Sequence, residues 1–436
     1  MFGFIKRLFG SQPAGCTERP AAPAPLPVAP RPAAPAVVLQ RDEIIDATTR
    51  IAGYRFSARR IAPTEDIDAA ATHAVLLASN IAALAERRLA LIPISVDDWQ
   101  RLDYRPLIAA RTVFALSPPA HPDQLAEWQE AADAIHACGA SIALDSAALD
   151  ALGDAAGRYA DYLLLDFSAA SLANFEQAIR TLRTTHPKAQ LIADRVNRWP
   201  EHRYCLANDI AYCLGSFSTA PDEEKQNGEI DQSRLVLIEM LNGLRQEIDL
   251  EELAQIAKRD PGVVVKVIAM ANSPLLGLPQ TVTSIDQAIM VLGRQQLYRW
   301  LAIGMFRAGS ASPRDEVLLE LALARGRFLE LLGQEKFAKA ECDELFLLGL
   351  LSLLDSLLGL PMAQVVERIH LTPALREVLL NNGGPLGRYL LLAIAVEKGH
   401  VQNVARLAGQ LGHSLEAVEA ASVEAIAWAE EAAGST

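Results

Sequence analysis

The strongest constraint on the fold is a change of pattern near residue 220. From about residue 37, short apolar runs alternate with amphipathic segments such as HPDQLAEWQEAADAIHACG, whereas the later part of the chain is almost purely helical in pattern. Strands that alternate with helices predict parallel pairing through crossover helices. The runs are IAGYRFSAR, LALIPISV, RTVFAL, ASIALDS, ADYLLLDFS, AQLIADRV and IAYCLGSF. Seven such units favour a closed or nearly closed β/α barrel, with functional groups at the carboxyl ends of its strands.

The length of the chain predicts more than one domain. It has 436 residues, of which 51% are hydrophobic, so two folded cores can form. We expect a short amphipathic tip and a Pro/Ala-rich disordered linker over residues 1–36, because dense proline favours extended, solvated chain. The barrel then spans 37–220, a polar linker spans 221–234, and a helical domain spans 235–436.

Composition narrows the classes of partner. A formal net charge of -13 argues against a general nucleic-acid binder, which needs basic surface, so no nucleic-acid partner is expected. Five scattered cysteines without a Cys-x-x-Cys motif predict reduced thiols and a cytoplasmic protein. Residues 1–10, MFGFIKRLFG, are either a docking peptide for a partner or weakly for a membrane surface, or a frayed terminus.

The order of the runs resembles the EAL domain, a barrel family that hydrolyses cyclic di-GMP with metal ions. The resemblance rests on GYRFSAR, ALDS, YLLLD and CLGSF, and covers roughly residues 37–221. It implies where the functional residues of the family fall. Arg55 stands at the position of the metal-binding Glu of the family's first strand. A metal-ligand Asn falls on Pro93, a Glu on Ala115, and the catalytic Lys on Leu164.

The remaining family positions are also altered. The paired Asp-Asp of the family is Asp145-Ser146 here, a further Glu becomes Asp194, and a Gln falls on Leu214. Asp145, Asp166 and Asp194 are left as acidic positions of the barrel. Divalent metal catalysis needs several converging oxygen ligands. We therefore predict a degenerate barrel with no metal, no cofactor and no catalytic residues.

Two interpretations of the remaining arginines stay open. Arg59 matches the phosphate-contacting Arg of the family, and together with Arg55 it is a possible phosphate contact, because guanidinium groups bind phosphate in a bidentate manner. The barrel would then bind cyclic di-GMP without turnover. Alternatively, Arg55 pairs internally with Asp166 or Asp145, because a buried arginine needs a carboxylate partner.

The segments DLEELAQIAKRDPGVVVKVIAMANSP and VTSIDQAIMVLGRQQLYRW resemble the HDOD domain, an all-helical relative of the HD phosphohydrolases, over roughly residues 229–412. The HD enzymes hold metal with His and a His-Asp pair. This chain has no His-Asp dipeptide, and no histidine lies between His202 and His370. The resemblance therefore implies a scaffold.

Local signals place several helix boundaries. Asp249 with Glu252, Asp260 before Pro261, and Ser284 with Gln287 are typical of helix starts. Asn272, Ser273 and Pro274 predict a break. We interpret Asp260, Asn272 and Ser273 as caps, with a small-ligand pocket as the alternative. LFLLGLLSLLDSLLGL is apolar nearly all round, which predicts one central buried helix.

The expected fold class is therefore multidomain, a degenerate EAL-type β/α barrel followed by an all-α HDOD domain, as in two-domain bacterial signalling proteins of the YuxH type. This resemblance implies a noncatalytic regulator that contacts other signalling proteins and is linked to cyclic di-GMP pathways. The alternatives are a cyclic di-GMP receptor without turnover and a residual cyclic di-GMP phosphodiesterase.

Overall fold

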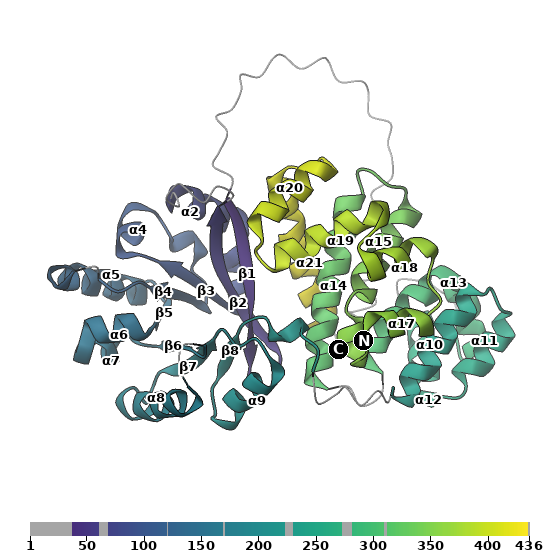
Figure 1. Cartoon of the computed structure of the whole chain (residues 1–436), viewed down its shortest axis with the longest axis horizontal. Helices are drawn as coiled ribbons and strands as arrows, with labels where there is room; N and C mark the ends of the chain where they lie inside the picture. The colour runs from purple at the N-terminus through teal and green to yellow at the C-terminus, as the bar shows by residue number, and fades with distance from the viewer. Residues whose placement is uncertain are drawn as a thin grey trace, which may run out of the picture.

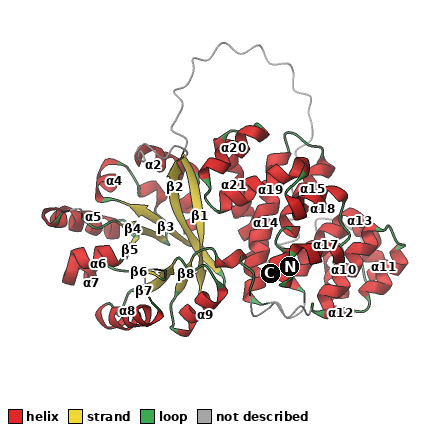
Figure 2. Ribbon diagram, viewed as in Figure 1, coloured by secondary structure: helices red, strands yellow, loops and turns green. Residues whose placement is uncertain are grey.

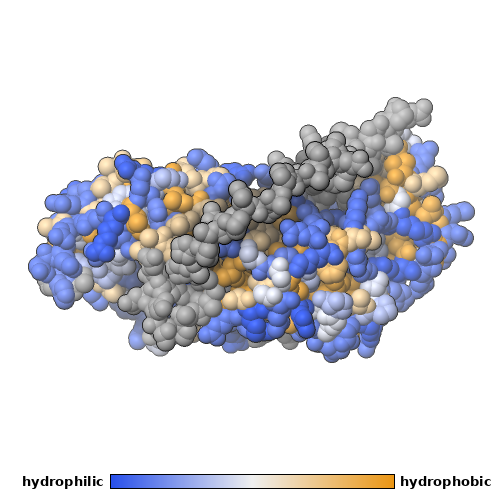
Figure 3. Space-filling view, turned by 90° about the horizontal axis from the view of Figure 1, so that it is seen from above, coloured by the Kyte–Doolittle hydropathy of each residue, from blue (hydrophilic) through white to orange (hydrophobic). Residues whose placement is uncertain are grey.

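The computed structural model describes residues 37–60, 69–119, 121–168, 171–222, 230–272, 281–308 and 312–434. A barrel surrounded by helices lies beside an all-helical part (Figure 1), and strands occur only in the first of these described parts (Figure 2). The predicted docking tip at residues 1–10 lies outside the described residues, as do Ser273 and Pro274. On the face drawn in Figure 3, hydrophilic residues dominate and hydrophobic residues form separate patches.

Eight strands close the barrel in sequence order. They are β1 (Val37–Asp46), β2 (Ile51–Arg60), β3 (Leu89–Ile94), β4 (Thr112–Leu116), β5 (Ser141–Leu144), β6 (Tyr162–Asp166), β7 (Gln190–Asp194) and β8 (Tyr212–Leu214). Strands β2 to β8 pair in parallel, whereas β1 is antiparallel to both β2 and β8. The barrel prediction is confirmed, but the sequence reading missed β1, the strand that closes it.

Alternation along the strands builds two layers of core. One face of each strand fills the barrel interior, with the buried residues Ile44, Leu89, Leu91, Val113, Ala143, Ile192 and Leu214. The other face packs against the surrounding helices. These are α2 (Ala69–Ala78), α3 (Ile81–Ala85), α4 (Val96–Arg101), α5 (Leu125–Ala137), α6 (Ser146–Leu152), α7 (Ala156–Tyr159), α8 (Leu172–Thr185) and α9 (Trp199–Ala207).

The helical part is built around one continuous apolar core. It contains α10 (Gln232–Arg245), α11 (Leu250–Ala257), α12 (Pro261–Ala271), α13 (Ile285–Gly304), α14 (Pro313–Gly333), α15 (Lys339–Leu351), α16 (Leu354–Leu358), α17 (Met362–Arg368), α18 (Pro373–Asn381), α19 (Gly384–Glu397), α20 (Val401–Leu411) and α21 (Leu415–Gly434). Short 3-10 helices lie at Arg105–Leu107, Pro122–Gln124, Gly153–Ala155, Phe217–Thr219 and Met305–Arg307. Helices α14 and α21 lie on the side of the helical part that is next to the barrel (Figure 1).

Most of the predicted helix starts are confirmed. The Asp260 carboxylate accepts hydrogen bonds from the amides of Gly262 and Val263, and the Ser284 hydroxyl accepts one from the amide of Gln287. Asp249 precedes α11, but its side chain makes no capping hydrogen bond. Asn272 follows α12 and does more than cap it, because its side-chain amide both donates to and accepts from the backbone of Val282, each at 2.7 Å.

The predicted single central helix is wrong in one respect. The segment is buried, but it forms two helices, α15 and α16, that separate at Ser352 and Leu353. The Ser352 hydroxyl donates to the Gly349 carbonyl at 2.7 Å and accepts from Arg325, so the helix ends at a half-buried polar contact. Across the described ranges, no single helix has the length and apolarity to cross a membrane. The segments Lys339–Leu358 and Met362–Arg368 reach that length and apolarity only when they are taken together, and the chain bends sharply between them.

Candidate functional site at the barrel mouth

Polar side chains gather at the end of the barrel where its parallel strands finish. Arg55 lies in register with Leu91 of β3 and with Asp42 of β1, and Asp166 lies in register with Asp194. Side chains alternate between the two faces of a strand. Because Leu91 faces the barrel interior, Arg55 shares that face. The mouth of the barrel, where β/α barrels place functional groups, therefore carries a cation and several carboxylates.

Arg55 is held between two carboxylates. Its Nη1 donates to Asp194 Oδ2 at 2.7 Å, and its Nε and Nη2 donate to Asp42 Oδ2 at 3.1 and 3.0 Å. Burial acts to lower the pKa of Arg55, but attraction to Asp194 and Asp42 outweighs it and raises the pKa. The structure thus gives Arg55 internal carboxylate partners. They are Asp42 and Asp194, not the expected Asp166 or Asp145, because the strand register places Asp42 directly opposite Arg55.

The other two acidic positions have separate partners. Asp166 accepts hydrogen bonds from the amide and hydroxyl of Ser168 at 2.9 and 2.7 Å, and it forms an ion pair with Arg195 at 2.9 Å. Asp145 caps α6 by accepting from the amide of Ala148 at 2.8 Å. Of the predicted site residues, the structure brings Arg55 and Asp194 into direct contact and leaves Asp145 in a structural role.

Arg59 is exposed at the rim of the same mouth. Its Nε donates to Gln40 Oε1 at 2.8 Å, and Gln40 Nε2 donates to Asp42 Oδ1 at 2.6 Å. A continuous chain of hydrogen bonds therefore runs from Arg59 through Gln40, Asp42 and Arg55 to Asp194. Sequence reasoning missed Gln40 and Asp42 because both lie on β1. The only local signal in VVLQRDEIID was a pair of short apolar runs around a polar centre, which does not show the alternation expected of a strand.

These donors do not fit a metal centre of the EAL type. The guanidinium of Arg55 already binds Asp42 and Asp194, and Asp166 is paired with Arg195. Apolar side chains stand at Pro93, Ala115 and Leu164, where the family resemblance places polar ones. Within the part of the chain that the structure describes, no three His, Cys, Asp or Glu side chains are grouped to hold a metal ion.

The other face of β1 meets the helical part. Arg41 bonds to Glu419 and, at 2.8 Å, to the Ser422 hydroxyl, both on α21. Arg88, just before β3, pairs with Glu320 of α14 at 2.6 Å and with Glu430 of α21 at 3.2 Å. The side chains of Arg41, Arg88, Glu320 and Glu430 are at most 15% exposed. Buried, charged contacts therefore join the barrel to the helical part.

Comparison with known proteins gives a family for the second part. Residues 235–368 match the HDOD domain family. The Vibrio cholerae protein named cyclic di-GMP phosphodiesterase CdgJ is 24% identical over 274 residues, which is 63% of this chain and 63% of that protein. The Bacillus subtilis protein YuxH is 26% identical over 277 residues, 62% of this chain and 65% of that protein. The matches thus span less than two thirds of either relative.

Solved structures that match the chain include EAL domain proteins. One, from Listeria monocytogenes, covers 42% of this chain and 86% of its own, with 16% identity and a TM-score of 0.33. Another is the Bacillus subtilis YkuI protein, solved with cyclic di-GMP and calcium, which covers 59% of this chain and 71% of its own, with 16% identity and a TM-score of 0.34. The chain therefore places an eight-stranded closed barrel before a helical part in which residues 235–368 match the HDOD domain family.

Proposed function

We propose that this chain is a noncatalytic bacterial signalling protein that acts through protein–protein contacts within cyclic di-GMP pathways. One observation carries the proposal, namely that the Arg55 guanidinium lies between Asp42 and Asp194 at the mouth of the barrel. The link to cyclic di-GMP draws on the name of the relative CdgJ and on the resemblance of the barrel to EAL domains.

The set of donor groups at the mouth supports the noncatalytic part of this proposal. Metal-assisted hydrolysis of a phosphodiester needs oxygen ligands that converge on the ion and a bound water. Asp42 and Asp194 converge on a guanidinium instead, and Asp145 is turned toward the start of α6. An arginine supplies a fixed positive charge, but it cannot lower the pKa of a bound water as a metal ion does.

The helical part lies against the same mouth. Gly399, just after α19, has a φ of 63° and lies so close to Gln40 that a Cβ at residue 399 would clash with the Gln40 side chain. Gln40 belongs to the hydrogen-bonded chain between Arg59 and Asp42. A change at the mouth therefore reaches the helical domain through direct contact, which suits a regulator that presents surfaces to partners.

A second candidate function is a cyclic di-GMP receptor without turnover. Arg59 favours it, because this side chain is exposed at the rim and only a neutral amide, Gln40, is hydrogen-bonded to it among the described residues. An exposed guanidinium can contact a phosphate without first losing a carboxylate partner. Residual phosphodiesterase activity, as in the name of CdgJ, is the less favoured alternative.

Calorimetry on the purified full chain separates these functions. Cyclic di-GMP is titrated with and without Mg²⁺, and the mixture is assayed for the linear dinucleotide. The proposal expects no linear product under either condition. Binding that is lost in Arg59→Ala but kept in Arg180→Ala, an exposed arginine on α8, would establish the receptor function. Formation of linear product would overturn the noncatalytic assignment.

A further inference from the structure

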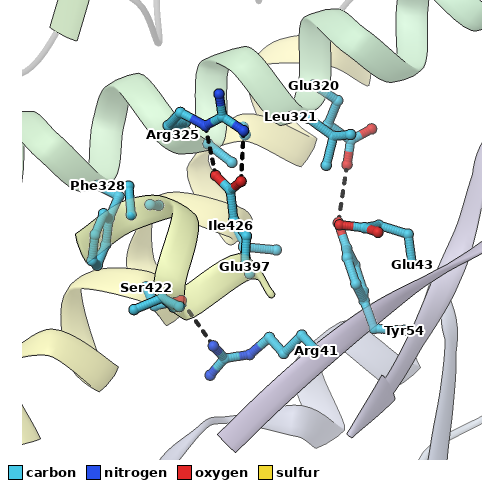
Figure 4. A pocket seen from close by; sticks show the side chains of 15 residues that line it. Arg41, Glu43, Tyr54, Glu320, Leu321, Arg325, Phe328, Glu397, Ser422 and Ile426 are labelled. Atoms are coloured by element: carbon cyan, nitrogen blue, oxygen red, sulfur yellow. Dashed lines mark hydrogen bonds and ion pairs between the residues drawn. The ribbon is translucent and has the colours of Figure 1, made fainter. Parts of the chain in front are cut away.

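A cavity of about 60 Å³ lies between the barrel and the HDOD part (Figure 4). Strands β1 and β2 form one side, and α14, α19 and α21 form the other. Its apolar lining includes Leu321, Phe328, Val396 and Ile426. Its polar lining consists of groups that mostly have partners, namely Arg41, Glu43, Tyr54, Glu320, Arg325, Glu397 and Ser422.

Glu43 differs from the other charged groups around this cavity. Arg325 forms a bidentate pair with Glu397 at 2.8 and 2.6 Å, and Glu320 is paired with Arg88. Glu43 makes no ion pair with any residue that the structure describes. Figure 4 shows its side chain on the same side of the cavity as Tyr54 and Glu320. The interface therefore holds a carboxyl group with no cation of its own.

The surroundings of Glu43 favour its neutral form. The pKa of Glu43 is raised to about 8, chiefly by burial and also by the nearby carboxylates of Glu397 and Asp42. A hydrogen bond from its own backbone amide and the charge of Arg325 act in the opposite direction. The charged or titratable groups that face it are Arg41 and Asp42 on β1, Tyr54 on β2, Glu320 and Arg325 on α14, and Glu397 on α19. Arg88 and Glu430 lie one contact further out, around Tyr54 and Glu320.

We propose that the contact between the barrel and the HDOD domain is a proton-sensitive latch, in which β1 docks against α14, α19 and α21 with the Glu43 carboxyl protonated. When the two domains separate, water reaches Glu43 and the carboxyl releases its proton. Docking is therefore coupled to proton uptake and weakens as the pH rises. Since Arg41 and Asp42 are neighbours of Glu43 on β1, the latch lies next to the hydrogen-bonded chain of the mouth.

The size of the effect follows from linkage. A carboxyl whose pKa is near 4.5 in the open form and about 8 in the docked form makes opening more favourable by about tenfold per pH unit between pH 6 and pH 8. Above that range both forms are ionised and the dependence levels off. The isosteric variant Glu43→Gln cannot ionise, so its docking should not change over this range.

Hydrogen–deuterium exchange on the full chain tests the latch. Exchange is measured at pH 6, 7 and 8, corrected for intrinsic rates, over Val37–Asp46 and Leu415–Gly434, with β4 as an internal reference. In the natural chain, protection of the first two segments should fall by roughly tenfold per pH unit while β4 stays constant. In Glu43→Gln, the protection of all three segments should stay constant from pH 6 to pH 8. In the control variant Glu251→Gln, protection should change with pH as it does in the natural chain.

Several outcomes would overturn the latch. Protection of the interface segments could be independent of pH in the natural chain, or it could titrate to the same extent in Glu43→Gln. A loss of protection in β4 that parallels the interface would point to global unfolding instead. The pH series on the natural chain decides the matter even if Glu43→Gln folds poorly, because it needs no substitution.

Discussion

The Arg55 guanidinium lies 2.7 Å from the Asp194 carboxylate, across the mouth of the barrel and 139 residues away in the sequence. Asp42 holds the same guanidinium from the other side at 3.0 Å. One cation therefore serves two carboxylates that come from β1 and β7. Removing one partner of such a group lowers the stability of the fold, because the charges that remain are poorly hydrated and no longer compensated.

We predict that Arg55→Met lowers the free energy of unfolding by about 1–2 kcal/mol, because Asp42 and Asp194 lose their shared cation while still in contact with some water. Urea denaturation at pH 7 measures the loss. The matched control is Arg195→Met, since Arg195 pairs with Asp166 but its side chain is 63% exposed. That control should lose about 0.5 kcal/mol or less. Equal losses in the two variants would contradict a special role for Arg55.

The same residues show what the sequence could and could not predict. Alternating apolar runs predicted seven strands and the barrel, because hydrophobic periodicity is a local signal. Strand β1 was missed because its middle residues, Arg41, Asp42 and Glu43, interrupt the apolar pattern. Arg41 binds Glu419, 378 residues away, and local sequence carries no sign of that partner.

The site was predictable to a similar extent. The charge of Arg55 and the loss of the metal ligands were visible as residue types, and the need for a carboxylate partner followed from burial. The identity of the partners depends on barrel register and on β1, which the sequence pattern did not define. In the helical part, the caps at Asp260 and Ser284 were readable because a capping residue and its target lie within three positions.

A second prediction concerns Arg88, which joins the two domains. Its guanidinium bonds to both carboxylate oxygens of Glu320, at 2.6 and 3.0 Å, and also pairs with Glu430. Arg88→Met should lower the free energy of unfolding by about 3 kcal/mol, because it leaves the buried Glu320 carboxylate without its cation and removes one of the two cations that pair with Glu430. Thermal and urea denaturation give the measurement.

The neighbouring Arg87 supplies the control for this experiment. It pairs with the same Glu430 at 3.5 Å, but its side chain is 57% exposed. Arg87→Met should therefore cost about 1 kcal/mol or less. If Arg88→Met and Arg87→Met were equally mild, the domains would not depend on the buried pair.

A third prediction tests the packing of α14 on α15. At Gly349 an added Cβ would clash with the backbone of Gly326, so the two helices approach each other through a pair of glycines. Gly349→Ala should push the helices apart and cost about 2 kcal/mol. In contrast, Gly409 on α20 is exposed and has open space around it, so Gly409→Ala should gain about 0.5 kcal/mol from helix propensity. A gain in both variants would refute the close approach.

The fourth prediction concerns His202 on α9, which is 1% exposed and stacks on Phe217 with 4.6 Å between ring centroids. Burial, together with the charge of Arg203, lowers the pKa of His202 to about 4. The unfolded chain binds a proton at this position below pH 6.5, whereas the folded chain does so only near pH 4. Stability should therefore fall as the pH drops from 6.5 to 4, by about 3 kcal/mol for this residue.

His202→Phe keeps the stacked ring and removes the titrating group. We expect its free energy of unfolding, followed by urea denaturation from pH 7 to pH 4.5, to decline less than that of the natural chain by about 2–3 kcal/mol. Other groups titrate in the same range, so the difference between the two proteins is the quantity to measure. His121→Phe, at an exposed position, should follow the natural chain. Parallel curves for His202→Phe and the natural chain would mean that His202 is protonated in the folded protein.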